Sequence, residues 1–399
     1  MMAAFCVPRA LMPEGRRFYP LRVRVRVQKS RLHYEMPHVR RFPLRYSLFA
    51  RITWYSLIVL PYLLGSLSVS VEAIAQSHPN QLDTLIQSGQ AALDSGDFSR
   101  AVEAFEQAIR LAPDSLRANR GLVLSYLQAG RLAAASGLGQ NAVKRWPQDA
   151  QLQHWLGLAY FEQGQNGAAL EALRRAEGLD RGNFDIHFDT ALVLLAESQY
   201  SPAADELEQA LKIKPDAPTA HILLGRAYLN SNRTIEAIGQ FQSALRLDPN
   251  VHLGHYHLGF AYASLGRDQE AIAEYEKEKT RSPEDPEVLY QLGHCLLESG
   301  NREGAITNLQ RAIQLDPRRF DATYDLGKAM FLNGQTEAAI PILRRAVELQ
   351  PADPSPHYQL ARALEKLGQK DDARREWQQF SELKKMQPQT GGMASGRDH

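Results

Sequence analysis

Prolines recur along this chain at a fixed interval, and that interval limits the folds the chain can adopt. Every gap between them is 34 residues except one of 68, where Arg181 occupies the missing position. The prolines are Pro113, Pro147, Pro215, Pro249, Pro283, Pro317 and Pro351. A repeat of roughly 20–50 residues is typical of stacked units that contact only their neighbours. The spacing therefore predicts a repeat array rather than one globular core.

Other columns of the sequence keep the same register. With the proline as position 32 of a 34-residue unit, nine units run from residue 82 to residue 387. Position 20 is alanine in all nine units, position 8 is small in eight, and position 27 is alanine in seven. Small residues at fixed positions let two helices approach closely, while larger residues at positions 7, 11, 24 and 28 fill the space between them.

Unit seven shows why each unit should be a helical hairpin. Asp285 can cap a helix that begins at Pro286, and leucines follow at helical spacing. Gly300 permits the positive φ of a turn. A second amphipathic helix then ends before Pro317, because proline has no N–H to donate. The pattern predicts an all-α chain of antiparallel helix pairs.

The columns resemble the tetratricopeptide repeat, with a small residue at 8, aromatic or Leu at 11, Gly at 15, Ala at 20, a bulky residue at 24, Ala at 27 and Pro at 32. The resemblance covers nine consecutive units. It implies an α-solenoid, a right-handed superhelix of antiparallel helix pairs, whose first helices line a concave groove that receives peptides or protein segments. It implies no particular partner.

Three units depart from the pattern. Gly137 and Gly139 lie inside the second helix of unit two, which should be the loosest because each glycine costs roughly 1 kcal/mol relative to alanine. Glu278 and Lys279 replace a small and an apolar residue in unit six, so that helix should be shifted in register or have an exposed face. Pro341 predicts a bend near the start of the second helix of unit eight.

The two ends of the chain differ from the repeats. Unit nine keeps Trp377 and Phe380 on its inner side, and the charges around them predict a solvating cap helix. Residues 388–399 are low in apolar content and predict a disordered tail. Residues 1–51 hold twelve Lys or Arg against two acidic residues, and 52–71 hold no charge. With small residues at 73–75, the segment 1–75 predicts a basic leader and a cleaved export signal, and 76–81 a short linker.

The apolar segment has a second interpretation, a membrane anchor that is never cut. Twenty residues at about 1.5 Å each would just span a bilayer of roughly 30 Å. Pro61 and Gly65 favour cleavage. Either interpretation places the repeats beyond a membrane, periplasmic or secreted in one case and anchored on the outer side in the other. Translation from Met36 would give an ordinary basic n-region; an unusually long signal and a functional basic arm are the alternatives.

Charge and composition exclude several function classes. The chain is +1 overall and residues 1–75 carry 12 − 3 = +9, so residues 76–399 carry 34 − 42 = −8. An acidic array lacks the basic surface that binds nucleic acid. No phosphate-binding glycine loop, nucleophile elbow or zinc spacing occurs, so we expect no enzyme and no cofactor. Cys295 has no partner after leader removal and should be a buried, inert thiol.

Histidines give the best metal candidates, but the repeat register argues against them. The candidates are His252, His255 and His257, with His221 and His187 in earlier units. His187, His221, His255 and His357 all share position 4, a packing column. We therefore predict no metal site.

Positions 5, 9 and 12 of the first helix share one face, turned away from the packing positions 8 and 11. On this face the later units carry aromatic and basic residues, whereas position 9 is leucine in units two to four. The candidate partner-binding residues, which we call the tyrosine–cation stripe, are Arg226, Tyr256, Phe260, Tyr290, His294, Tyr324, Lys328, Tyr358 and Arg362. Tyrosines give rigid contact area, and arginines bind carboxylates directionally. Position 5 aromatics are also common packing residues in this repeat type.

The sequence thus favours an exported, non-enzymatic scaffold that binds an acidic protein or peptide segment in its groove. The alternatives are a structural solenoid that associates with other copies of itself, and a membrane-anchored adaptor that serves an enzyme in trans. A monomer whose size is independent of concentration would favour the first hypothesis.

Overall fold

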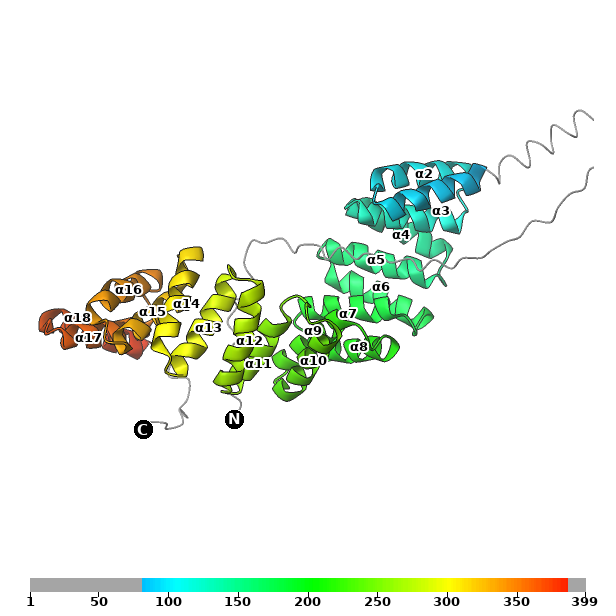
Figure 1. Ribbon diagram of the computed structural model, residues 1–399. Coiled ribbons are helices and arrows are strands. Elements are labelled where there is room, and N and C mark those ends of the chain that lie inside the picture. Colours follow the sequence, from blue (N-terminus) through cyan, green and yellow to red (C-terminus); the bar gives the residue numbers. More distant parts are fainter. Residues whose placement is uncertain (1–80, 387–399) are drawn as a thin grey trace, which may run out of the picture. The chain divides into compact units, whose positions relative to one another are not determined.

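The computed structural model describes residues 81–386, and all regular structure in that range is α-helical (Figure 1). The export segment, most of the linker and the predicted tail lie outside the described residues. A helix over 81–95 comes first. The later first helices of the repeats are α3 (Leu116–Gln128), α5 (Ala150–Glu162), α7 (Phe184–Ala196), α9 (Pro218–Asn230), α11 (Gly254–Ser264), α13 (Pro286–Glu298), α15 (Phe320–Leu332) and α17 (Pro354–Lys366).

The second helices of the repeats alternate with the first. They are α2 (Phe98–Leu111), α4 (Leu132–Arg145), α6 (Asn166–Leu179), α8 (Tyr200–Ile213), α10 (Thr234–Leu247), α12 (Asp268–Arg281), α14 (Arg302–Leu315), α16 (Thr336–Leu349) and α18 (Lys370–Met386). Each helix packs mainly on the helix before it and the helix after it. The prediction of an all-α solenoid of tandem helix pairs is confirmed.

Local sequence explains where the helices begin and turn. Asp285 accepts a hydrogen bond of 2.8 Å from the N–H of Glu287 and so caps α13. At position 15 the chain adopts a positive φ, +87° at Gly300 in unit seven. Where the glycine is absent the conformation persists, since Ser198 and Asn232 also have positive φ. The turn geometry therefore belongs to the repeat and not to glycine alone.

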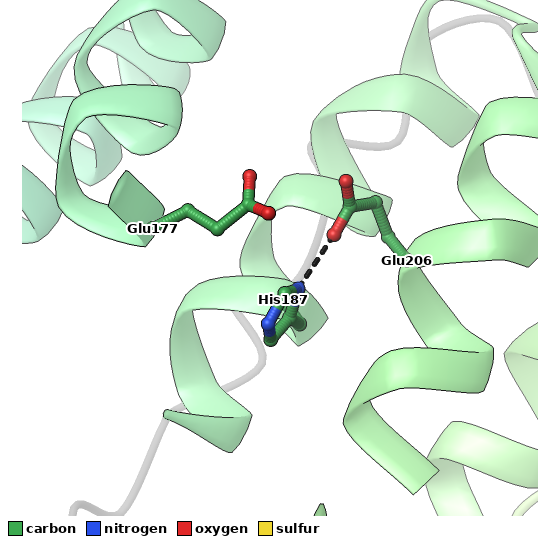
Figure 2. A group of neighbouring side chains, drawn as sticks. All are labelled: Glu177, His187 and Glu206. Atoms are coloured by element: carbon green, nitrogen blue, oxygen red, sulfur yellow. Dashed lines mark hydrogen bonds and ion pairs between the residues drawn. The ribbon is translucent and has the colours of Figure 1, made fainter. Parts of the chain in front are cut away.

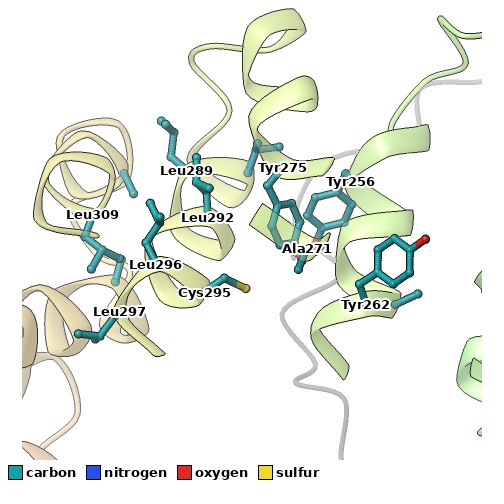
Figure 3. Close-up of a cluster of buried hydrophobic side chains, with 14 of the residues drawn as sticks. Tyr256, Tyr262, Ala271, Tyr275, Leu289, Leu292, Cys295, Leu296, Leu297 and Leu309 are labelled. Atoms are coloured by element: carbon teal, nitrogen blue, oxygen red, sulfur yellow. The ribbon is translucent and has the colours of Figure 1, made fainter. Parts of the chain in front are cut away.

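Small residues bring the two helices of a unit together. A Cβ atom on Gly293 would lie 2.7 Å from Cγ of Leu309, so α13 and α14 could not pack this closely around a larger residue. Figure 3 shows part of the core that α11 to α14 share. Cys295 lies in this core, unpaired and 2% exposed. Its burial raises the pKa of the thiol to about 12, which agrees with the expected inert cysteine.

Unit six corrects the expectation for Glu278. The second helix, α12, keeps its register, since Ala271 and Tyr275 are buried as in other units. Glu278 is itself buried, and its Oε2 accepts a hydrogen bond of 3.3 Å from the N–H of Tyr256. Position 34 is the last residue of a unit and precedes the first helix of the next one. In unit five it is Val251, whose side chain has no acceptor for a helix cap. Glu278 supplies an acceptor at the start of α11 instead. The predicted register shift or exposed face is therefore wrong for Glu278.

The other departures stay within regular helices. Helix α16 continues through Pro341, and the predicted bend stays a prediction. Helix α4 contains Gly137 and Gly139 without a break, so its looseness also remains to be measured. The half-buried Trp377 and Phe380 both pack against the ring of Tyr358, with centroids 5.4 Å apart in each case.

Among the helices of residues 81–386, none is both long and apolar enough to cross a membrane.

Candidate partner-binding surface

The first helices of successive repeats lie against one another. Helix α9 contacts α11, α11 contacts α13, α13 contacts α15, and α15 contacts α17. Within the described residues, no second helix contacts the next second helix to the same extent. The first helices therefore line the shorter, inner side of the stack, and the tyrosine–cation stripe lies on these helices.

Tyr256 is a packing residue. Its side chain is 4% exposed, and its ring lies beside those of His257 and Tyr275. The phenol donates a hydrogen bond of 3.3 Å to Glu287 of the next repeat. Burial raises the pKa of Tyr256 well above its usual value. For Tyr256, the interpretation of position 5 aromatics as packing residues holds.

Tyr290 is half-buried and already binds a cation from the same chain. The guanidinium of Arg319 lies 4.4 Å from the centre of the Tyr290 ring, and its Nη2 donates a hydrogen bond of 2.6 Å to Glu287. Burial raises the pKa of Tyr290. Glu287 thus joins Tyr256 of one repeat to Arg319 of another.

Two cations of the stripe are matched by carboxylates one repeat away. Nδ1 of His294 lies 2.8 Å from Oδ2 of Asp325, and this hydrogen bond raises the pKa of His294. Nζ of Lys328 donates a hydrogen bond of 2.9 Å to Glu298. Desolvation is the largest single influence and acts to lower the pKa of Lys328, but the hydrogen bond to Glu298 and the charges of Glu298 and Asp325 together outweigh it, so the pKa is raised. Both residues are therefore charge-compensated within the chain.

Aromatic rings surround the last cation of the stripe. The guanidinium of Arg362 lies 5.2 Å from the centre of the Phe331 ring and 5.5 Å from that of Tyr358. Arg362 forms no ion pair within residues 81–386. Tyr358 is exposed, and Tyr324 is half-buried with its ring stacked on Phe320. This end of the stripe combines a free guanidinium with accessible rings.

Arg226 is the other cation without a carboxylate. It is exposed on α9 and makes no hydrogen bond or ion pair through its side chain in the part of the chain that is described. Burial, together with the charge of Arg226, lowers the pKa of nearby His257 to about 3, so this imidazole is neutral. Phe260, half-buried on α11, lies 6.4 Å from Tyr256, centre to centre.

Sequence reasoning missed the partners of the stripe. Glu287 occupies position 2, Asp325 position 6 and Glu298 position 13, whereas Arg319 lies at position 34, before a helix. Positions 2, 6 and 13 follow the same helical face as positions 5 and 9, one turn to either side. Extending the stripe by one turn would have placed the three carboxylates on this face, but not shown which cation each of them contacts.

A related bond occurs in the earlier repeats. Nε2 of His154 on α5 lies 2.7 Å from Oδ2 of Asp189 on α7, and both side chains are buried. Burial raises the pKa of Asp189. Cross-repeat bonds between an imidazole and a carboxylate therefore hold neighbouring first helices together at two places in the array.

The position 4 histidines link the two helices of their own unit. Nδ1 lies 2.7 Å from Glu206 for His187 and 2.7 Å from Gln240 for His221. His257 instead stacks on Phe241, 5.5 Å away. The histidines named as metal candidates do not converge on one point. The one group in the described range whose ligand atoms converge is Glu177, His187 and Glu206, of which only His187 was a candidate.

Comparison with known sequences gives a family match over most of the array. A profile of the tetratricopeptide repeat matches residues 86–150, 138–184, 154–218, 188–252, 222–286 and 290–354. A second profile of the same repeat matches 330–384. Together the two profiles cover more than half of the chain.

Curated relatives match over shorter stretches. The peroxisomal targeting signal receptor of Saccharomyces cerevisiae is 24% identical over 184 residues, 44% of this chain and 30% of the receptor. Anaphase-promoting complex subunit 3 of Schizosaccharomyces pombe is 30% identical over 132 residues, 33% of this chain and 20% of that protein. The chain thus spans less than a third of the length of these two relatives.

Solved structures give similar matches. The protein YrrB, described as having an unusual peptide-binding site, is 23% identical with a TM-score of 0.43, over 47% of this chain and 97% of that one. The Cut9–Hcn1 complex is 16% identical with a TM-score of 0.46, over 67% of this chain and 52% of that one.

Proposed function

We propose, from the premise that the chain belongs to the tetratricopeptide repeat family, that it is an exported, non-enzymatic scaffold that binds an acidic protein segment. The family and the relatives support a role in protein–protein interaction. A targeting signal receptor and a complex subunit, as those relatives are named, are both proteins that contact other proteins.

The observation that carries the proposal is the contrast between two groups of cations. His294 and Lys328 each have a carboxylate partner from a neighbouring repeat. Arg226 and Arg362 have none within the described residues. A guanidinium without an acceptor binds a carboxylate through paired N–H donors, and at Arg362 the rings of Phe331 and Tyr358 help to exclude water from the contact. The two arginines are thus the proposed anchors for acidic side chains of the partner.

Accessible aromatic rings supply the rest of the proposed contact. Tyr290 and Tyr324 are half-buried and Tyr358 is exposed, so each has ring surface that a partner can cover. Their rings are held by Arg319, Phe320 and Trp377, which reduces the conformational entropy lost on binding. Tyr256 is buried and supports this surface from beneath.

Peptide selection followed by mutation tests the proposal. The full chain would be used to select ligands from a displayed peptide library, and dissociation constants would be measured by fluorescence anisotropy. We expect an acidic consensus, and we expect Arg226→Gln with Arg362→Gln to weaken binding about tenfold or more, since a bond to a charged group contributes about 1.5–3 kcal/mol.

The matched control is Arg174→Gln with Arg344→Gln. Both arginines are exposed on second helices and form no ion pair in the described range. The control should bind selected peptides with unchanged affinity. Equal losses of affinity in the two double variants, or selected peptides without acidic residues, would contradict the proposed surface. Lys328→Glu is less informative, because it would place a carboxylate against Glu298.

The proposal of export rests on the leader sequence, in which a basic stretch is followed by the uncharged segment 52–71 and by small residues at 73–75. Mass mapping of the N-terminus after expression in the native host would test it. Mature peptides that begin after residue 75 in an extracytoplasmic fraction would support a cleaved signal. Peptides from 1–75 in a cytoplasmic fraction would overturn export. Light scattering over a range of concentrations would separate a monomeric scaffold from a self-associating solenoid.

A further inference from the structure

Three ionisable side chains meet at the boundary between repeats three and four. Figure 2 shows Glu177 of α6, His187 of α7 and Glu206 of α8 with their polar groups turned toward one another. Each offers one ligand atom, and these atoms all lie within 4.8 Å of one another. His187 is 4% exposed, and the two glutamates are half-buried.

The imidazole of His187 is held in a fixed orientation. Nε2 lies 3.1 Å from the backbone oxygen of Arg181 and is suited to donate to it. Nδ1 therefore faces the carboxylates, 2.7 Å from Oε2 of Glu206. An imidazole that donates one ring N–H to a backbone carbonyl presents its other nitrogen as a ligand, which is the usual second-shell arrangement of metal-bound histidine.

Equivalent positions in other repeats show that this group is not a general feature of the array. His221 has Gln240 in place of Glu206, and Leu211 in place of Glu177. His255 keeps a glutamate partner but has Leu245 at the Glu177 position. That position normally carries an apolar packing residue. Glu177 makes no hydrogen bond or ion pair within the described part of the chain, so packing does not explain the carboxylate.

Electrostatics points to a cation at this place. Two carboxylates that converge in a partly buried site repel each other unless a positive charge lies between them. Desolvation lowers the pKa of His187, but the hydrogen bonds to Glu206 and to the backbone oxygen of Arg181, together with the charges of both glutamates, outweigh it and raise the pKa. The surroundings of the imidazole therefore favour positive charge, and a bound divalent cation would supply two positive charges.

We propose that Glu177, His187 and Glu206 form a binding site for a divalent transition-metal ion of the zinc type. One imidazole nitrogen and two carboxylate oxygens are ligands that zinc accepts, and a water molecule or a partner's side chain would complete four-coordination. The metal would join three successive helices, α6, α7 and α8, and stabilise the junction where the proline repeat is interrupted by Arg181. The site is independent of the tyrosine–cation stripe.

Metal titration of the full chain tests the proposal directly. After removal of metals by chelation, Zn²⁺ would be added in a calorimeter, and Co²⁺ would be followed by its visible absorption, which reports coordination geometry. We expect one equivalent to bind, with an affinity that falls as the pH is lowered, because protons compete with the metal for the imidazole and carboxylate ligands. Glu177→Leu, which installs the residue found at this position in two later repeats, should weaken binding at least about tenfold.

Two further variants complete the test. His187→Asn should abolish the Co²⁺ spectrum, whereas His255→Asn, which alters the equivalent histidine that lacks a third ligand, should leave it unchanged. Circular dichroism would show that each variant remains helical. Absence of saturable Zn²⁺ binding, or unchanged binding in both Glu177→Leu and His187→Asn, would overturn the proposal.

Discussion

Nδ1 of His294 and Oδ2 of Asp325 lie 2.8 Å apart and join α13 to α15 across the boundary between two repeats. Asp325 is 5% exposed, so its carboxylate depends on this bond for compensation. In a solenoid, contacts between neighbouring units supply much of the cooperativity, because each unit touches only its neighbours. The pair is therefore both an interface bond and part of the proposed binding surface.

Replacing His294 by alanine should destabilise the array by about 2–3 kcal/mol, because it leaves the Asp325 carboxylate buried without its partner. The double variant His294→Ala with Asp325→Leu should lose less than the single variant, since no charge remains buried. Urea unfolding of the wild type, both single variants and the double variant would give the coupling energy. A double variant less stable than His294→Ala would contradict this account.

The same pair should give a pH-dependent contribution to stability. The pKa of His294 is raised above 6.5 in the folded chain, so the folded state holds the proton more tightly than the unfolded state. This contribution is fully present below about pH 6.5 and is lost as the pH rises through the raised value. The coupling energy should be smaller at about pH 9 than at about pH 6; a larger value at high pH would refute the assignment.

The pKa shift of His257 should make stability depend on pH in the opposite direction. Its pKa is lowered from 6.5 to about 3, so the unfolded chain binds a proton in a range where the folded chain does not. Between these values the free energy of unfolding should fall as the pH falls, by at most about 1.4 kcal/mol per pH unit. His257→Phe keeps the ring stack on Phe241 and should reduce this acid sensitivity. Exposed His252→Asn should change it less, because the charge of His252 is the smallest of the influences that lower the pKa of His257.

The fold could be predicted because each repeat encodes its own helices. Gly300 and Pro317 mark a turn and a helix end locally, and position 20 identifies the close contact between helices without knowledge of the whole array. The charged contacts could not be predicted in this way. Lys328 meets Glu298 only after two first helices are placed side by side, and a pattern within one unit does not specify that placement. Glu278 shows the same limit: its acceptor role depends on Tyr256 of a different helix.

Gly137 and Gly139 allow the looseness of α4 to be measured. A Cβ atom at Gly137 would meet nothing within 4 Å, so Gly137→Ala should stabilise the helix by about 0.5–1 kcal/mol. At Gly139 a Cβ atom would lie 3.2 Å from Leu156, and part of the gain should be lost to this contact. Amide hydrogen exchange along α4 would show slower opening in Gly137→Ala than in Gly139→Ala. If exchange were slower in Gly139→Ala than in Gly137→Ala, the side chain of Leu156 would be able to move aside without cost.

Glu278 gives a test of helix capping by a side chain from another helix. The N–H of Tyr256 would lose its acceptor in Glu278→Ala, although alanine is the usual residue at this position. We expect exchange of the Tyr256 amide hydrogen to accelerate about tenfold, since an unsatisfied buried donor costs about 1–3 kcal/mol. Glu278→Gln retains an acceptor oxygen and should exchange close to the wild-type rate. If Glu278→Ala and Glu278→Gln behaved alike, the start of α11 would depend on backbone geometry at Leu253, whose φ is +55°, and not on the glutamate.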